Sequence, residues 1–542
     1  MTFSVLEPDP STYHLWRRFS MPTTGGSRDA FAVPSGVANR LNSAYTFLVS
    51  MIVLDAWVLV LLLVLLWYTQ RNNRRGTSST TGTAIWNAKA SPSDVVKLTA
   101  IHFKNHRKWS MIPWMMLALF SLVAHYAIPI EVAPYIILNN AAPVAADAIY
   151  VPSPVGGTEV STLKTFYLQA PSAFRAVGNV QTIISSKNPR VSVDSPVLLQ
   201  DLGGGEAIMS VAYRYSVSGV DFGLQHYPDL VLNVEGSCTT DYGALSQTFE
   251  SDNITVNVYD LWPGYQAVQV SLFDGPSPQG FLRLGPLSPT GPAGNFTWGA
   301  VVSSLQRGSV TEGTDPWYLT SPIPNTQDFV VKPGRPALSC WQNDVWSYKG
   351  HNSTITALDA LPGLDLSEGL QAILIDSLDQ PLIVNLATAL GPQALASTAT
   401  SLGQFFDAED SSFYRDIERL VIASYIASAN VLTESVLFAE NRLGVPNFIL
   451  GDDGQALPGT DDFVIWSSRV GTLSVRTIII IPVLALALFL IVISMIIFFP
   501  PLGKEQVDQP KDTANKLEDS VNEPEDIEKG PLEPESNGVQ DR

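Results

Sequence analysis

The chain has 542 residues, of which 46% are hydrophobic and only 15% are charged, and its mean hydropathy is +0.14. A soluble domain carries about 25% charged residues, so this composition argues against a wholly soluble protein and indicates membrane segments.

Three apolar runs are long enough to cross a membrane. Residues 45–68 are interrupted only by Asp55, residues 111–130 have no formal charge but contain His125, and residues 477–499 are uncharged throughout. Each run reaches the roughly 20 residues that span about 30 Å of hydrocarbon. We therefore predict three transmembrane helices at these positions, with the lipid bilayer as a partner.

The distribution of charge predicts the orientation of these helices. Residues 69–110 carry eight basic residues and one acidic residue, whereas residues 1–44 have a net charge of only +1. Basic residues in short loops remain in the cytoplasm. We therefore predict an N-terminal extracytoplasmic segment (1–44), a basic cytoplasmic loop (69–110), an extracytoplasmic domain (131–476) and a cytoplasmic tail (500–542), in the plasma membrane or the secretory pathway.

The large domain changes character along its length. Apolar residues alternate in runs such as EAIMSVAYRYSVSG (206–219), and turn-forming clusters such as DGPSPQG separate these runs. A period of two over about 205–350 is typical of half-buried strands. Residues 356–442 lack this alternation, and apolar residues recur there at helical spacing. We predict an α+β domain with an antiparallel β-sandwich-like part followed by helices.

The domain also contains cysteines and glycosylation sequons, which are modified in oxidising and glycosylating compartments. Asn253, Asn295 and Asn352 each begin an Asn-x-Ser/Thr sequon, and Cys238 and Cys340 are the only cysteines. We expect glycans at the three asparagines and a disulfide between the cysteines. Closing a loop of about 100 residues stabilises a fold by roughly 4.7 kcal/mol in chain-entropy estimates. A reactive thiol and an intermolecular bridge remain the alternatives.

The stretch ALSCWQNDVWSYKGHNST (337–354) has the residues of either an active site or a scaffold. We expect Trp341, Trp346 and Tyr348 to pack beside the disulfide rather than to form a platform for sugars. His351 has no orienting carboxylate or nucleophile nearby in the sequence, as a catalytic histidine would need. The stretch therefore predicts a structural role.

No motif for catalysis, for a metal or for a cofactor occurs elsewhere. HExxH, CxxC, Walker A and GxSxG are absent from the sequence, and GDDG (451–454) does not continue into an EF-hand, although loose calcium binding is an alternative. We predict no catalytic residue, metal or cofactor. Glycoside hydrolysis stays open, because it requires only two carboxylates about 5–9 Å apart, and residues 131–476 hold 34 acidic residues.

Asp55 is an acidic residue within a predicted transmembrane helix, and such residues often have a functional role. It lies near the outer end of its predicted span, so snorkelling or a hydrogen bond to His125 explains it without transport. The tail from residue 501 has 12 acidic and five basic residues with several prolines, and we predict that it is disordered.

The segment SCWQNDVWSY (339–348) beside a sequon, the long acidic outer domain, and SSRVGTLSVR (467–476) before the last span together resemble uncharacterised multi-span membrane proteins of filamentous fungi. The resemblance implies this architecture and a cell-surface setting, and no known activity. We expect a non-enzymatic membrane glycoprotein that binds or senses a cell-wall or surface ligand, with no nucleic-acid partner. The alternatives are a membrane-anchored ecto-hydrolase acting on carbohydrate and a structural subunit that organises other membrane proteins.

Overall fold

The computed structural model describes most of the chain as two compact units. It covers residues 7–73, 85, 91–106, 112–153, 159–251, 254–271, 278–287, 295–304, 306–401, 405–437, 444–451 and 453–498. The larger unit comprises residues 1–47 and 130–482, and the smaller unit comprises residues 48–129 and 483–542. The predicted disordered tail and the sequon residue Asn253 lie outside the described residues.

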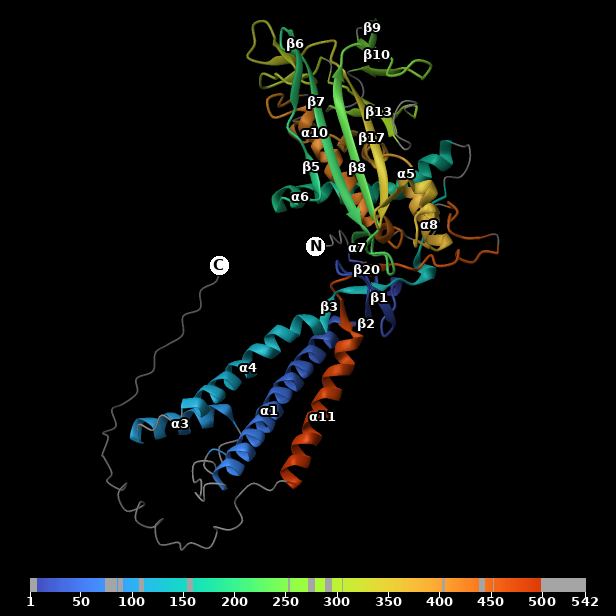
Figure 1. The fold of residues 1–542 in the computed structure, drawn as a ribbon. Coiled ribbons are helices and arrows are strands. Elements are labelled where there is room, and N and C mark those ends of the chain that lie inside the picture. Colours follow the sequence, from blue (N-terminus) through green and yellow to red (C-terminus); the bar gives the residue numbers. More distant parts are fainter. Residues whose placement is uncertain are drawn as a thin grey trace, which may run out of the picture. The chain divides into compact units, whose positions relative to one another are not determined.

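Long apolar helices identify a membrane protein. The helices are α1 (Ser35–Asn73), α3 (Pro92–His106), α4 (Ile112–Ile136) and α11 (Val475–Phe498), and α1, α4 and α11 have the length and composition of membrane spans (Figure 1). Phe120 of α4 is 74% exposed and Phe498 of α11 is 78% exposed. Large apolar side chains that remain exposed around a helix are typical of a surface that contacts lipid.

A fourth apolar segment, Leu382–Thr400, also has the length and hydropathy of a span. Its helix α9 (Leu382–Leu390) ends after nine residues, where Gly391 adopts a φ of +54° and Pro392 follows. Nine residues extend about 14 Å, which is half of the roughly 30 Å that a span requires. Ile383 and Leu390 are buried in the core of the larger unit, and α9 is therefore a core helix.

An antiparallel sheet of eight strands forms the centre of the larger unit. Its order is β12-β13-β17-β8-β7-β5, with β18 paired to β17 and β6 paired to β7. The strands are β5 (Val191–Val193), β6 (Val197–Gly203), β7 (Glu206–Ser218), β8 (Val231–Asp241), β12 (Gly280–Leu284), β13 (Asn295–Val302), β17 (Ala337–Tyr348) and β18 (His351–Ser353). Figure 1 shows β7, β8 and β17 side by side, and the predicted strand over 206–219 is confirmed as β7.

The inner face of this sheet is buried beneath helices. It carries the odd-numbered residues of β7 and the even-numbered residues of β8 and β17. The helix α10 (Phe413–Glu434) packs against β7, and it begins where Ser412 accepts a hydrogen bond from the Arg415 amide at 3.2 Å, as an N-cap does. The other helices of this unit are α5 (Glu159–Gly178), α6 (Val180–Ser186), α7 (Gly219–Phe222) and α8 (Glu368–Leu378).

A smaller sheet covers one end of the outer face. Its order is β11-β10-β9, from β9 (Leu245–Ser251), β10 (Ile254–Tyr259) and β11 (Val268–Ser271). Tyr259, Val268 and Val270 of this sheet form a second core with Val301 and Ala337 of the central sheet. The α+β class is confirmed, but the two sheets overlap only at this end, so most of the outer face has no second layer.

Short strands complete the larger unit. The sheet β15-β16-β14-β19 contains β14 (Gly308–Ser309), β15 (Thr320–Pro322), β16 (Phe329–Val331) and β19 (Phe405–Phe406), and a two-stranded sheet pairs β20 (Val464–Trp466) with β4 (Ala141–Pro143). β14 and β19 are parallel, and every other named pair of strands is antiparallel.

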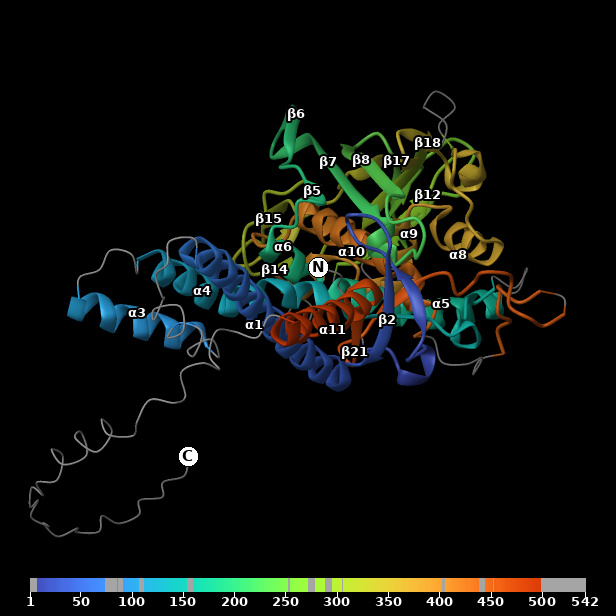
Figure 2. The same cartoon turned by 60° about the horizontal axis from the view of Figure 1, so that its bottom comes forward.

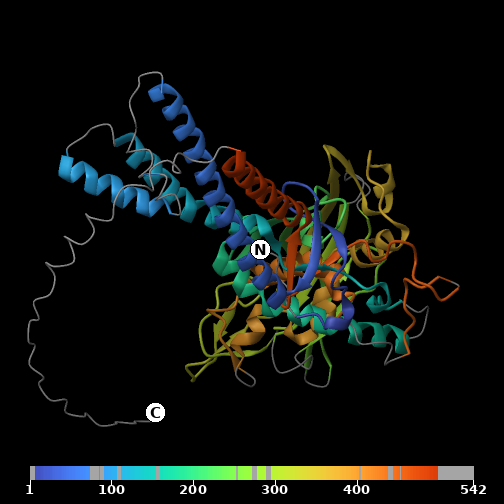
Figure 3. The same ribbon diagram turned by 90° about the horizontal axis from the view of Figure 1, so that it is seen from below.

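A four-stranded sheet, which we call the junction sheet, connects directly to all three long apolar helices. Its order is β1-β2-β21-β3, from β1 (Arg18–Met21), β2 (Arg28–Pro34), β21 (Val470–Ser474) and β3 (Ile137–Asn139). α1 follows β2 without a gap, α4 runs directly into β3, and α11 follows β21. Figures 2 and 3 show the blue N-terminal strands beside the red strand β21, although more than 400 residues separate them in the chain.

Hydrogen bonds fasten the junction sheet where the chain enters and leaves it. The Thr472 hydroxyl accepts a hydrogen bond from the Ala141 amide at 2.8 Å and donates one to the Ala141 carbonyl at 2.6 Å. The Thr477 hydroxyl donates to the Tyr135 carbonyl at 2.9 Å. The first turn of α11 is therefore joined to the end of α4 as well as to its own strand.

The N-terminal segment is part of the large domain. Phe19, Met21 and Ala30 are buried in the same core as the central sheet. The Glu7 carboxylate accepts hydrogen bonds from the Ser467 hydroxyl and from the Ser468 amide at 3.1 Å. Partial burial of Glu7 opposes its ionisation, but these hydrogen bonds outweigh that effect and lower its pKa. The sequence predicts a separate N-terminal segment, but residues 7–34 are part of this domain.

Gly471 of β21 tests the packing of this junction. A Cβ atom at this position would lie 2.2 Å from the Cβ of Ala38 in α1. We expect Gly471→Ala to lower the free energy of unfolding by about 1–3 kcal/mol, as overpacking does, and to lower the Tm of the full-length protein in detergent. Gly25→Ala is the matched control, because nothing lies within 4 Å of a Cβ there. Equal Tm values for the two variants would contradict the close packing.

Candidate binding face on the central sheet

The predicted disulfide is present. Cys238 of β8 and Cys340 of β17 are directly opposite each other in neighbouring strands, and a bond joins their sulfur atoms. Both side chains are buried on the inner face. The disulfide therefore links two central strands, and neither cysteine of the chain is a free thiol.

Two of the three aromatic residues near the disulfide have the predicted structural role. Trp346 is fully buried, and its ring stacks on that of Phe222 with centroids 5.6 Å apart. Tyr348 is also buried and contacts Tyr227 edge to face at 6.0 Å. These rings fill the core beneath the sheet.

For Trp341 the prediction is wrong. Its side chain is 44% exposed and lies on the outer face of β17. Successive side chains of a strand point to opposite faces, so Trp341 cannot share the inner face with Cys340 and Trp346. The odd sequence distance between Trp341 and Trp346 was the signal that could have revealed this.

The outer face around Trp341 is polar. In register across the strands it carries Ser210, Arg214, Asn233, Glu235, Ser237, Thr239, Thr297, Ser339 and Asn343. Several of these groups are held in place, since the Asn233 amide donates to the Ser347 hydroxyl at 2.9 Å and the Arg214 guanidinium donates to the Ser192 hydroxyl at 3.1 Å. Arg214 is directly opposite Glu235, so their charges offset each other.

A second pair of aromatic residues borders this face. Trp262 and Tyr265 belong to the loop between β10 and β11, and their ring centroids are 5.8 Å apart. A Cβ atom at Gly285 would lie 2.5 Å from the Trp262 ring, and one at Gly299 would lie 3.3 Å from it. The two glycines therefore allow the indole to lie against the strands. Tyr265 is 50% exposed.

These residues form a row across neighbouring strands. The Gly285 amide donates to the Thr297 carbonyl at 2.8 Å, Thr297 pairs with Trp341, and Trp341 pairs with Ser237. Adjacent strands are about 4.8 Å apart, so Gly285, beneath Trp262, and Trp341 are about 10 Å apart. The outer face thus presents an aromatic ring, a hydroxyl, a second ring and a further hydroxyl in sequence.

The predicted glycosylation sites and histidine lie at the edge of the sheet. Asn352 and His351 are exposed on β18. Asn295 begins β13, and its backbone pairs with Asn343; its side chain, like Asn253, lies outside the described residues. Among the described residues, no hydrogen bond connects His351 to a carboxylate, so the structure does not assemble a triad there.

The intramembrane polar residues are not joined. Asp55 belongs to α1 and His125 to α4, and no hydrogen bond connects them in the part of the chain that the structure describes. The Nδ1 atom of His125 is buried without a hydrogen-bond partner.

Two carboxyl groups near the start of α10 have no sequence signature. The Asp416 carboxylate is fully buried and accepts hydrogen bonds from the Tyr318 hydroxyl at 2.6 Å and from the Ser397 amide at 2.8 Å. Asp315 accepts hydrogen bonds from the Trp317 amide at 2.9 Å and from the Phe413 amide at 3.1 Å. Burial raises the pKa of Asp416 to about 6 and that of Asp315 to about 7. The pair fastens two loops to the start of α10.

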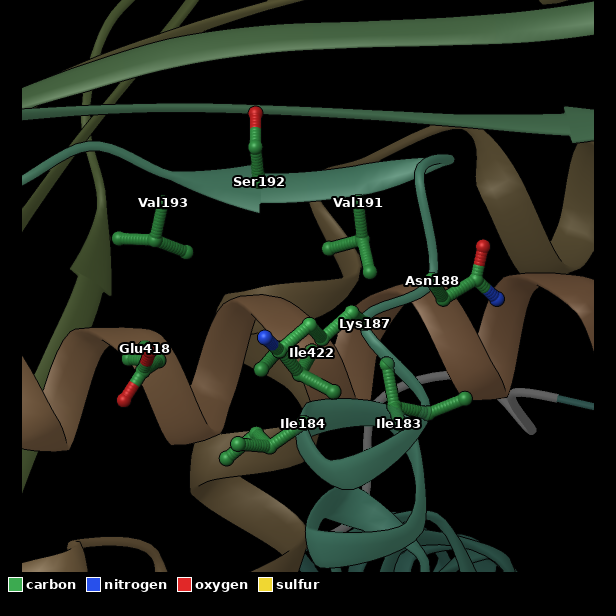
Figure 4. Close-up of a pocket in the computed structure, with 9 residues that line it drawn as sticks. All are labelled: Ile183, Ile184, Lys187, Asn188, Val191, Ser192, Val193, Glu418 and Ile422. Carbon is green, nitrogen blue, oxygen red and sulfur yellow. The ribbon is translucent and has the colours of Figure 1, made fainter.

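Two cavities lie away from this face. The first, of about 160 Å³, lies between α6, β5 and α10 (Figure 4). Val191 and Val193 point toward Ile422 of α10, whereas Ser192 points away. This volume is below the roughly 300–1,000 Å³ of ligand pockets. The second cavity, of about 330 Å³, is lined by Asp315, Glu409 and Ser411 among others. The described residues contain no cluster of three or more metal-ligating side chains.

The buried carboxyl groups predict a dependence of stability on pH. Because their folded pKa values of about 6 and about 7 exceed the ordinary value of 3.8, the unfolded chain loses these protons first as pH rises. The contribution of these two groups to stability should therefore be fully present below about pH 4 and should be lost as the pH rises through 7. We expect Asp416→Asn to reduce this fall by on the order of 3 kcal/mol, measured as Tm against pH in detergent.

Asp359→Asn, at an exposed carboxylate, is the control for this series. An unchanged pH dependence in Asp416→Asn would contradict the assigned role of the buried carboxyl group.

Comparison with known proteins identifies the family. Residues 170–465 match a family described as a domain of unknown function, DUF8406. This segment contains the central sheet, the small sheet, α10 and the whole of the outer face described above. No curated protein and no solved structure matches the chain. The matched segment is more than half of the 542 residues, and the chain therefore belongs to the DUF8406 family.

Proposed function

We propose that the protein is an integral membrane glycoprotein whose large domain lies outside the cytosol and recognises a surface ligand on its outer sheet face without transforming it. The junction sheet is the observation that carries this proposal. The plasma membrane or the secretory pathway is the setting that we propose, in line with the resemblance to fungal membrane proteins.

The junction sheet supports three spans with this orientation. β2, β3 and β21 lie in one sheet, so the three helix ends attached to them lie on one side of a membrane. In this arrangement α1 leaves that side, α4 returns to it, and α11 leaves it again. The loop 69–110 and the tail then share the opposite side, and the basic composition of that loop identifies this side as the cytoplasm.

The polar chemistry of the domain supports binding rather than catalysis. Both oxygens of Asp315 and both oxygens of Asp416 accept hydrogen bonds, which is the arrangement of structural carboxyl groups. On the outer face Glu235 is directly opposite Arg214, so this carboxylate faces a cation rather than the second carboxylate that hydrolysis requires.

One observation favours the hydrolase as a second candidate. Asp315 lines the 330 Å³ cavity together with Glu409, and its raised pKa is typical of a general acid. Incubating the full-length protein with cell-wall polysaccharides separates the candidates. New reducing ends that disappear in Asp315→Asn would establish hydrolysis and contradict a purely recognising domain.

A different observation favours the organising subunit. The strand β6 is exposed along its whole length, and Val197, Leu198 and Leu199 are apolar. Extra residues opposite β7 disrupt the pairing of β6 at two places, and such bulges discourage strand addition. A partner at this edge would therefore contact the side chains of the leucines rather than extend the sheet.

Glycosylation tests the placement of the domain. We expect an N-glycosidase to reduce the apparent mass of the full-length protein on a gel, because the sequons are exposed to the glycosylating compartment. Asn253→Gln, Asn295→Gln and Asn352→Gln should each remove part of this shift. If no variant changes the mass and the enzyme has no effect, the domain lies in the cytosol and the proposed function is wrong.

A further inference from the structure

We infer that the ligand of the outer face is a neutral, hydroxyl-rich polysaccharide that lies across β12, β13, β17 and β8. This inference rests on the proposed function, since it names the class of ligand for the same face. Trp341 and Trp262 are the aromatic contacts, and the hydroxyl and amide groups around them are the hydrogen-bonding contacts.

The exposed ring of Trp341 is the first feature that indicates a sugar ligand. It is a large apolar group standing in the middle of a polar sheet, with Thr297 and Ser237 directly beside it. Sugar rings present an apolar C–H face that packs on an aromatic ring, and hydroxyl groups at the rim that bind polar side chains. An isolated indole surrounded by hydroxyl groups matches both features.

The second aromatic contact indicates a chain of sugars. Trp262 lies against Gly285, two strands from Trp341, and against Gly299 on the neighbouring strand β13, and the exposed ring of Tyr265 packs edge to face against it. Neither described cavity is lined by Trp262 or Trp341, so the open strand surface between them suits a polymer laid across the strands better than a single small sugar.

The net charge of the domain selects against anionic ligands. Residues 131–476 carry 34 acidic and 15 basic residues, which repels anionic polymers and anionic lipid surfaces. On the face itself, Arg214 and Glu235 are opposite each other, and the exposed Arg283 of β12 lies opposite Gly299. A neutral polysaccharide is the ligand that requires no charge compensation.

The distribution of apolar groups distinguishes this face from a protein interface. The core of a protein–protein interface is a contiguous apolar patch. Around Trp341 the neighbouring side chains in register are Ser237, Thr297, Ser339 and Asn343, and the apolar end of the face is already covered by the small sheet. The remaining surface can hydrogen-bond extensively but buries little apolar area.

The test is retention of the full-length protein, in detergent, by insoluble β-1,3-glucan and by chitin particles, with an anionic polysaccharide gel for comparison. We expect one of the neutral polymers to retain the wild type and Trp341→Ala to bind it about tenfold more weakly. Trp341→Tyr should retain most of the binding, because it keeps an aromatic ring. Trp16→Ala removes another exposed tryptophan, outside the face, and should bind as the wild type does.

Each outcome decides the inference. Equal retention of the wild type and Trp341→Ala, no retention by either neutral polymer, or stronger retention by the anionic gel would overturn it. An unchanged Tm and an intact disulfide in Trp341→Ala exclude misfolding as the cause of lost binding. If the glycosidase shift places the domain outside the cytosol but no neutral polymer binds, the ligand class is wrong while the proposed function stands.

Discussion

The junction sheet is the constraint on which the rest of the structure depends. It pairs β2 with β21 and β21 with β3, and each of these strands continues into a long apolar helix. Backbone hydrogen bonds between the strands leave little freedom for the helix ends that they hold, and Thr472 and Thr477 add further bonds at the same place. The strands that begin and end the large domain thus meet at the place where the three long apolar helices are attached.

Side chains of the central strands alternate between the two faces of the sheet, and the two faces have different roles. On β17 the inner side chains, Cys340 and Trp346, close the core, while Trp341 between them faces outward. The disulfide to Cys238 stabilises the strands that display the outer face without taking part in it. A rigid sheet with a polar, partly aromatic surface is well suited to recognition, since it holds its contacts in place before the ligand arrives.

Local sequence patterns predict much of this architecture. The features that they do not predict depend on contacts between residues far apart in the chain. The apolar runs, the alternation over 206–219 and the two cysteines are local features, and the corresponding helices, strand and disulfide are present. The pairing of Ala30 with Ser474 joins residues at opposite ends of the chain, and no local pattern reports it. The outer face is hard to predict for another reason. Closeness in sequence suggests one environment for Trp341 and Trp346, although their positions in the strand place them on opposite faces of the sheet.

The most direct measurement of the central claim uses a single engineered cysteine, because both native cysteines are in the disulfide. Thr24→Cys lies at an exposed position between β1 and β2, and Ser79→Cys lies in the basic loop. The account predicts that a membrane-impermeant maleimide labels Thr24→Cys on intact cells and labels Ser79→Cys only after permeabilisation. Labelling of both without permeabilisation would contradict a membrane crossing by α1, and with it the proposed arrangement of the three helices about the junction sheet.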